Sequence, residues 1–150
     1  MPSILFVCTA NQLRSPVAAR VFEQSLTAAA RKKWQVASAG TWTQAGDRLP
    51  RGLARLALKL GVDLAGHNTT PVDAYPLDKF DWIVVMENDH LEGLTVEFPA
   101  LRGRIHLLTA LAGEFPSDIP DPSRLDEEGA TALLREMTEM VRRLAAKLQG

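Results

Sequence analysis

Short runs of apolar residues alternate along the chain with stretches in which apolar positions recur at helical spacing. The clearest runs are residues 4–7 (ILFV) and 82–86 (WIVVM), which are continuously apolar and rich in branched or aromatic side chains. Such runs are typical of parallel strands that are buried on both faces. Residues 34–39, which Gly40 ends, predict another strand, and residues 104–108 predict a shorter fourth one.

Three of the intervening stretches predict amphipathic helices. The first begins at Ser15-Pro16, because serine is a preferred N-cap and proline suits the first helical position. The second covers residues 51–60 and ends at Gly61, and the third runs from Asp126 to the end of the chain. The residues expected to face inward are Val17, Val21, Phe22, Leu26 and Ala29, then Leu53, Leu56, Ala57 and Leu60, then Leu134, Met137, Val141, Leu144 and Leu148.

This alternation of strands and helices predicts an α/β fold, in which a parallel sheet carries helices on both faces. In such sheets, ligands bind beyond the carboxyl ends of the strands. The loop that follows the first strand is therefore the first place to look for a functional site.

Length and composition narrow the class of protein. A chain of 150 residues, of which 46% are hydrophobic and 23% charged, fits one globular domain, and we expect residues 1–150 to form it. The net charge of −1 gives no electrostatic reason to expect a nucleic acid or an anionic membrane as partner. The basic clusters at residues 31–33 and 142–143 fit the solvated faces of helices.

The use of cysteine points to a cellular compartment. Cys8 is the only cysteine, which excludes an intramolecular disulfide. The apolar run at residues 4–7 is too short for a signal peptide or a membrane span, and no longer run follows it. These features predict a soluble protein of the reducing cytoplasm.

The loop after the first strand, residues 8–16 (CTANQLRSP), contains groups suited to binding a phosphate. A loop of this length lets successive backbone N–H groups converge on one point, to which the following helix adds the positive end of its dipole. The guanidinium of Arg14 can hold two oxygens of a phosphate bound there. The same positive field stabilises a thiolate at Cys8, which would face the phosphorus as a nucleophile.

A plainer interpretation treats Cys8 as a buried cysteine at a strand end and Arg14 as an ordinary surface charge. However, arginine, serine and proline at fixed distances from a cysteine arise together by chance in about one of several thousand sequences. The strand, loop and helix around them are an independent match. Both observations favour the catalytic interpretation.

Residues 7–16 resemble the signature of the low-molecular-weight protein tyrosine phosphatases, Val-Cys-x-Gly-Asn-x-Cys-Arg-Ser-Pro. Further segments resemble that family in the same order along the chain, namely 38–41 (SAGT), 66–67 (GH), 81–86 (DWIVVM) and 118–122 (DIPDP). The resemblance implies a flavodoxin-like sheet of four parallel strands with helices on both faces. It also implies hydrolysis of phosphate monoesters, by default protein phosphotyrosine, through a phosphocysteine intermediate and without a cofactor.

The resemblance assigns the acid to Asp121, which would protonate the leaving oxygen and later take a proton from water. Pro122 biases the backbone of Asp121 toward an extended conformation, which helps to present the carboxyl group. Asp118 is the competing carboxylate. It lacks a following proline and does not match the motif, so we rank it second.

Other residues of the matching segments acquire supporting roles from the resemblance. Those implied in substrate binding are Thr9, Ala10, Asn11, Gln12, Leu13, Arg14, Ser15 and Trp42. Those implied in holding the loop by hydrogen bonds are Asn11, Ser15, Ser38 and His67. For Trp42 a core or surface position fits as well as a place in the pocket wall. No spacing of metal ligands is present in the sequence, so we expect no metal.

Some residues depart from the family's pattern. Ala10 replaces the loop glycine, which would cost roughly 1 kcal/mol of strain if this position requires a positive φ. Leu13 replaces a second loop cysteine, whose role in the family is to trap an oxidised nucleophile as a disulfide. Ser123 and Arg124 stand where many members carry two aromatic residues, which leaves phosphotyrosine specificity open. None of these changes removes a catalytic residue.

Alternatives to a tyrosine phosphatase stay open at this stage. One is a phosphatase of another phosphoryl substrate, such as phosphoarginine on proteins. Another is a non-catalytic phosphate-binding regulatory module, although Arg14 and Asp121 together serve turnover. Arsenate reductases of this fold need further cysteines to pass on electrons, and this chain has none. We expect a phosphorylated protein as substrate and a monomer or weak homodimer.

Overall fold

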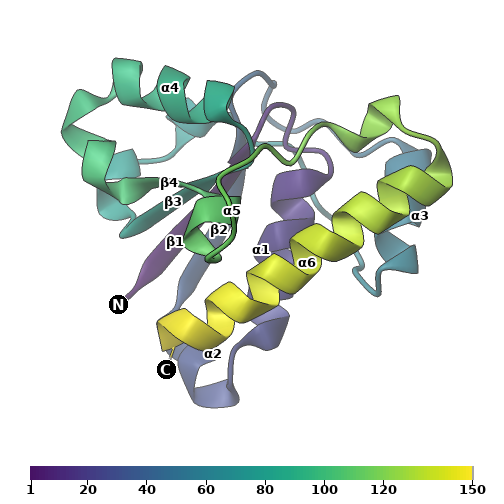
Figure 1. Ribbon diagram of the computed structural model, residues 1–150, viewed down its shortest axis with the longest axis horizontal. Coiled ribbons are helices and arrows are strands. Elements are labelled where there is room, and N and C mark those ends of the chain that lie inside the picture. Colours follow the sequence, from purple (N-terminus) through teal and green to yellow (C-terminus); the bar gives the residue numbers. More distant parts are fainter. Residues whose placement is uncertain (150) are drawn as a thin grey trace.

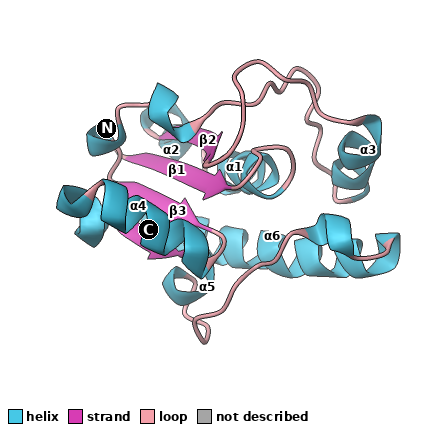
Figure 2. Cartoon of the chain, turned by 90° about the horizontal axis from the view of Figure 1, so that it is seen from above, coloured by secondary structure: helices cyan, strands magenta, loops and turns pink. Residues whose placement is uncertain are grey.

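A sheet of four parallel strands forms the centre of the computed structural model, which describes residues 1–149. The strands are β1 (Ser3–Cys8), β2 (Gln35–Gly40), β3 (Trp82–Val85) and β4 (Ile105–Leu107). Their order across the sheet is β2-β1-β3-β4, and each neighbouring pair is parallel. Figure 2 shows β1 between β2 and β3. This order is that of a flavodoxin-like sheet, so the predicted fold class is confirmed.

Helices cover both faces of this sheet. The α-helices are α1 (Arg14–Ser25), α2 (Ala28–Lys33), α3 (Arg51–Lys59), α4 (Asn88–Glu97), α5 (Leu108–Leu111) and α6 (Glu127–Gln149). Short 3-10 helices are η1 (Val72–Ala74), η2 (Leu77–Lys79), η3 (Pro99–Arg104) and η4 (Pro122–Arg124). The long helix α6 crosses α1 on one face, and α4 lies on the other (Figure 1).

The core is divided by the sheet into two layers. Ile4 and Phe6 belong to the layer that α1 and α6 cover, whereas Leu5 and Val7 belong to the layer on the side of α4. Because both layers are closed, every side chain of β1 is buried. This burial on both faces explains why the strand is a continuous apolar run rather than an alternating one.

The start of α1 differs from the sequence prediction. Ser15 is the second residue of the helix, and the N-cap position is held by Leu13, which makes no side-chain capping bond. The prediction that Ser15 caps the helix was therefore wrong. Its hydroxyl instead contacts Cys8 and Asn11 and the Ala39 carbonyl of β2.

The end of that helix was also placed too late. The chain leaves helical geometry at Leu26, whose φ of −79° and ψ of 147° are extended, and a new helix α2 follows. The Thr27 side chain caps α2 by accepting a hydrogen bond from the backbone N–H of Ala30. Ala29 consequently lies on an exposed face of α2, and its predicted place in the core was wrong.

The later helices follow their predictions more closely. The buried residues of α6 include Leu134, Met137, Val141 and Leu144, and Leu148 is partly buried. Helix α3 is more peripheral, since Ala57 is buried while Leu53, Leu56 and Leu60 pack only partly against the core. Gly61 has the positive φ, +77°, that favours glycine after a helix. Within residues 1–149, no helix combines the length and the apolar character needed to cross a membrane.

Candidate active site

The loop between β1 and α1 directs its first carbonyl groups away from its own interior. The carbonyl of Cys8 accepts a hydrogen bond from the backbone N–H of Thr41, and the carbonyl of Thr9 accepts one from Trp42, both at 2.9 Å. In a trans peptide the N–H group points opposite to the carbonyl. The N–H groups of Thr9 and Ala10 therefore point to the other side, as an anion nest requires.

Asn11 holds the loop in this shape from within. It adopts a φ of +57°, a conformation that asparagine tolerates better than most residues. Its Nδ2 donates to the hydroxyls of Ser15 and Ser38 at 2.9 and 3.0 Å, and its Oδ1 accepts from the Thr70 N–H at 2.9 Å. Its carbonyl accepts from His67 Nε2 at 2.8 Å. The structure thus brings together all the residues predicted to support the loop.

The strain anticipated for Ala10 does not arise. Among the non-glycine residues of the described chain, a positive φ occurs at Asn11 and not at Ala10. The position that requires glycine is instead Gly40, on the neighbouring strand β2, where the backbone lies close to the loop. A Cβ atom there would lie 2.5 Å from the Thr9 carbonyl oxygen and 3.0 Å from the Asn11 nitrogen.

The Cys8 sulfur lies at the bottom of the loop, where it contacts Ser15. The two side-chain atoms, Sγ and Oγ, are 3.0 Å apart, and both residues are buried. The Ser15 hydroxyl also accepts from Asn11 Nδ2 and lies 3.2 Å from the Ala39 carbonyl oxygen. Its proton can therefore turn from that carbonyl toward the sulfur when the sulfur is a thiolate.

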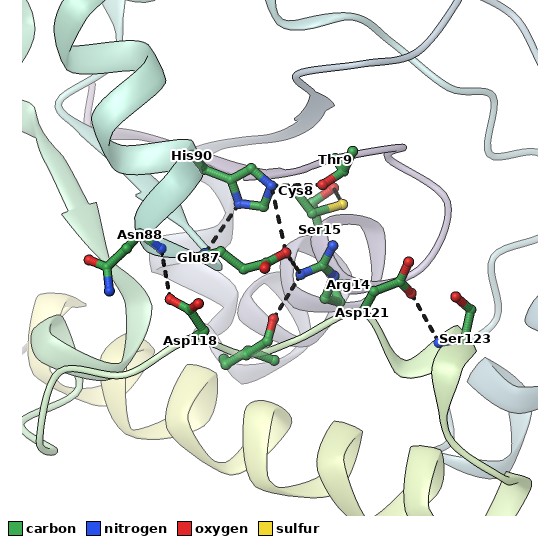
Figure 3. Close-up of polar contacts among 11 residues, drawn as sticks. Cys8, Thr9, Arg14, Ser15, Glu87, Asn88, His90, Asp118, Asp121 and Ser123 are labelled. Atoms are coloured by element: carbon green, nitrogen blue, oxygen red, sulfur yellow. Dashed lines mark hydrogen bonds and ion pairs between the residues drawn. The ribbon is translucent and has the colours of Figure 1, made fainter.

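Arg14 is fixed in a buried position by two acceptors. Its Nη1 donates to Oε2 of Glu87 at 2.6 Å and to the Ile119 carbonyl at 2.7 Å (Figure 3). The side chain is only 4% exposed. Because both contacts use the same nitrogen, Nε and Nη2 are left to form the planar fork that binds two phosphate oxygens.

Asp121 lies across from the loop, at the start of η4. Its Oδ1 accepts from the Ser123 backbone N–H at 3.0 Å. Partial burial raises the pKa of Asp121, but the Ser123 hydrogen bonds and the positive charges of Arg14 and Arg124 outweigh burial and hold it below its usual value. The free site therefore favours the carboxylate form.

Asp118, the competing carboxylate, has a different partner. Its Oδ1 accepts from the backbone N–H of Asn88 at 2.8 Å, at the first residue of α4 (Figure 3). This contact satisfies an N–H group that a helix N-terminus leaves unpaired. The geometry assigns Asp118 a structural contact, whereas Asp121 lines the same cavity as Cys8 and Arg14.

A cavity of about 120 Å³ joins these groups. The residues that line it are Cys8, Thr9, Ala10, Gln12, Leu13, Arg14, Leu53, Asp121, Pro122 and Ser123. A wider cavity of about 640 Å³ adjoins it and shares Thr9, Arg14 and Asp121. Trp42 lines neither cavity and is 83% exposed, so the structure does not bring it to the sulfur.

Glu87 and His90 belong to the site but were missed by the sequence prediction. They form a capping box at the start of α4, in which the Glu87 side chain accepts from the His90 N–H and His90 Nδ1 accepts from the Glu87 N–H. His90 Nε2 also lies 2.8 Å from Thr9 Oγ1. The signal in the sequence that could have revealed these two residues is their spacing, because a capping box joins the N-cap residue to the third helical residue. Within residues 1–149, no cluster of His, Cys, Asp or Glu side chains is arranged to hold a metal ion.

Comparison with known proteins identifies the family. A family model described as "Low molecular weight phosphotyrosine protein phosphatase" matches residues 3–150. The chain belongs to this family. Among its relatives is the low molecular weight protein-tyrosine-phosphatase Etp of Escherichia coli K12, which is 32% identical over 84% of this chain and 80% of its own length.

Solved structures of two relatives have the same fold. The tyrosine phosphatase Wzb from Escherichia coli K30, determined in complex with sulphate, is 29% identical, with a TM-score of 0.84 and 97% of each chain covered. The arginine phosphatase YwlE from Geobacillus stearothermophilus is 27% identical, with a TM-score of 0.86 over 99% of this chain and 94% of its own. The family therefore includes enzymes named for two different phosphorylated residues.

Proposed function

We propose that this chain is a phosphatase of phosphate monoesters that acts through a phosphocysteine, with protein phosphotyrosine as the default substrate. The observation that carries the proposal is that Cys8, Arg14 and Asp121 line one small cavity at the end of β1. A nucleophile, a phosphate-binding fork and an acid–base group that share one volume are what covalent phosphoryl transfer requires.

In the first step the Cys8 thiolate attacks phosphorus. The sulfur–phosphorus bond forms while the bond from phosphorus to the leaving oxygen breaks, and protonated Asp121 gives its proton to that oxygen. The loop N–H groups and the free edge of Arg14 bind the remaining phosphate oxygens, where negative charge is spread in the transition state.

In the second step a water molecule attacks the phosphocysteine. The Asp121 carboxylate takes the proton of that water, the sulfur–phosphorus bond breaks, and Cys8 leaves as a thiolate. The Ser15 hydroxyl, 3.0 Å from the sulfur, can donate a hydrogen bond to the departing thiolate. One carboxyl group thus acts as acid and then as base.

The first step needs Asp121 in its protonated form, and substrate binding favours that form. In the free site, the pKa of Asp121 is lowered by Ser123, Arg14 and Arg124 against the opposing effect of burial. A phosphate dianion bound at Arg14 brings negative charge beside the carboxyl group and so raises that pKa. We infer that Asp121 becomes protonated as the substrate binds.

Protein phosphoarginine is the second candidate substrate, because YwlE, a relative of the same fold, is named an arginine phosphatase. Phosphoarginine carries a cationic guanidinium next to its phosphorus. Arg124 lines the wide cavity beside Asp121, and its charge repels such a group. This repulsion favours phosphotyrosine over phosphoarginine. Trp42 lines neither cavity but is exposed and follows Thr41, which lines the wide one, so it offers an aromatic surface for a tyrosine ring outside that cavity.

The biological setting is proposed on the same basis. A nucleophilic cysteine must stay reduced, which fits the cytoplasm. We further propose that residues 1–150 act as one phosphatase domain, as a monomer or weak homodimer, on a phosphorylated protein.

A substrate panel tests the proposal. Phosphotyrosine peptides, phosphoarginine peptides and an aryl phosphate are each assayed with the wild type and with Cys8→Ser. We expect Cys8-dependent release of phosphate from the aryl phosphate and the phosphotyrosine peptides. Faster hydrolysis of phosphoarginine peptides would make protein phosphoarginine the proposed substrate. If no member of the panel showed Cys8-dependent release of phosphate, both substrates would be excluded.

A further inference from the structure

His90, in the first turn of α4, reaches both ends of the phosphate-binding loop. Its Nε2 lies 2.8 Å from Thr9 Oγ1, directly after the nucleophile. Its backbone N–H donates to the Glu87 side chain, whose Oε2 in turn accepts from Arg14 Nη1 at 2.6 Å. Figure 3 shows the ring above Glu87 and beside Thr9, with Arg14 below. One residue of α4 therefore connects with the loop where it begins and where it ends.

The hydrogen bonds define the tautomer of this ring. His90 Nδ1 accepts from the Glu87 backbone N–H at 3.2 Å, so this nitrogen carries no proton. The ring proton is then on Nε2, which donates to Thr9 Oγ1. A charged imidazolium has no acceptor nitrogen, and it would lose the bond to Glu87.

The surroundings favour the neutral ring. Burial is the largest influence and lowers the pKa of His90, and the charge of Arg14 lowers it further. The carboxylates of Glu87, Asp89 and Asp118 act in the opposite direction but do not prevail. The ring therefore remains neutral at pH 7, in the form that the hydrogen bonds require.

From this geometry we propose that His90 is a positioning residue, which fixes Thr9 directly and Arg14 through Glu87. The inference rests on the proposed function of the loop. The Thr9 side chain is tied to His90 while its carbonyl is tied to Trp42, so the peptide that directs an N–H group into the nest cannot rotate. A loosened Thr9 would weaken phosphate binding without altering the nucleophile.

A double-mutant cycle tests the direct contact, with inorganic phosphate as a competitive inhibitor of aryl phosphate hydrolysis. Thr9→Val removes the hydroxyl at nearly constant volume, and His90→Leu removes both ring nitrogens. Each is expected to weaken phosphate inhibition about three- to tenfold. The double variant should be no weaker than the worse single variant, because both changes break the same contact.

Conservative and remote variants provide the controls. Thr9→Ser keeps the hydroxyl and His90→Gln keeps a donor and an acceptor, so both should recover most of the affinity. His106→Leu alters a half-buried histidine that packs against Trp82 on the sheet, with ring centroids 5.4 Å apart, and should leave phosphate inhibition unchanged.

The outcomes separate this inference from the proposed function. Additive losses, or wild-type phosphate inhibition in Thr9→Val, would overturn the positioning role. If His90→Leu does not fold, the comparison of Thr9→Val with Thr9→Ser decides. If the wild type shows no Cys8-dependent turnover, the proposed function fails, and calorimetric phosphate binding by the same variants still decides the role of His90.

Nitrogen NMR of the labelled wild-type protein gives a readout that does not depend on activity. The ring nitrogen shifts of His90 at pH 7 should be those of a neutral imidazole protonated at Nε2. A charged ring, or a ring protonated at Nδ1, would contradict the hydrogen-bond pattern and with it the proposal.

Discussion

Among single residues, Cys8 and Arg14 contribute differently to the proposed reaction. Cys8→Ser removes the nucleophile but leaves the N–H groups and the guanidinium, so turnover should fall below detection while calorimetry still shows phosphate or vanadate binding. Arg14→Lys keeps the charge but loses the planar fork, and activity should fall by about 10²–10³-fold. Substantial turnover by Cys8→Ser would exclude the covalent mechanism.

The contribution of Asp121 to the rate of hydrolysis should be larger for leaving groups that need a proton in order to depart. Asp121→Asn is expected to slow hydrolysis of an alkyl or phenyl phosphate by about 10²–10³-fold, but that of a nitrophenyl phosphate far less, because nitrophenolate departs unprotonated. Asp118→Asn is the matched control, since an amide oxygen can still accept from the Asn88 N–H. Equal losses with both leaving groups would remove Asp121 from the acid role.

Arg124 should set the upper pH limit of activity through Asp121. Its positive charge contributes to the lowered pKa of that carboxyl group, although burial, the largest influence, acts in the opposite direction. The acid step needs the protonated form, which is lost as pH rises through the pKa. Arg124→Gln removes a charge that lowers the pKa, so the alkaline limb of the kcat profile should move to higher pH. An alkaline limb at the same pH as in the wild type, or at lower pH, would contradict this coupling between Arg124 and Asp121.

At the scale of elements, the loop depends on how closely the end of β2 approaches it. A methyl group at Gly40 would meet the Thr9 carbonyl oxygen at 2.5 Å, and a backbone atom cannot move aside as a side-chain tip can. Gly40→Ala should therefore destabilise the fold by about 1–3 kcal/mol in urea unfolding and weaken phosphate binding.

Gly52→Ala is the control for that change. Gly52 lies in α3, where an added Cβ has no neighbour within 4 Å. Alanine favours a helix over glycine by about 1 kcal/mol, so this variant should be slightly more stable and equally active. If both variants had the same stability, the close contact at Gly40 would not limit the loop.

Elements differed in how well they could be predicted, for a physical reason. β1 and β3 are buried on both faces, which leaves continuous apolar runs in the sequence. Helix α4 buries only His90 and Leu94 among its residues, and its remaining positions carry no apolar stripe, so the pattern gave no helix there. The cap predicted at Ser15 failed because local propensity does not include the tertiary partners of that hydroxyl.

At the scale of the whole molecule, the site combines segments that are far apart in sequence. Cys8 and Arg14 could be predicted because one short loop contains both, and Asp121 because its segment resembles that of the family. Glu87 and His90 reach the loop only because β3 pairs with β1 in the sheet, which places the start of α4 beside the end of β1. No sequence pattern within a single segment could predict that the start of α4 lies beside the end of β1.

The response to oxidation also depends on the whole chain. A cysteine activated as a thiolate is the target of peroxide, and its sulfenic acid is rescued only if a thiol reaches it before further oxidation. This chain has no second cysteine, and Leu13 lines the same cavity as Cys8. Because Cys8 is buried, the sulfur of another copy of the chain cannot reach it readily.

Peroxide without added thiol should therefore inactivate this enzyme beyond recovery by dithiothreitol, because the sulfenic acid goes on to the sulfinic acid, which thiols do not reduce. Bound phosphate should slow the loss by covering the sulfur. Mass spectrometry should show two added oxygen atoms on the peptide that contains Cys8. Leu13→Cys should restore recovery, since both side chains line the same cavity and a disulfide could then form. Full recovery of the wild type after prolonged exposure, with no thiol present, would show that another group protects Cys8.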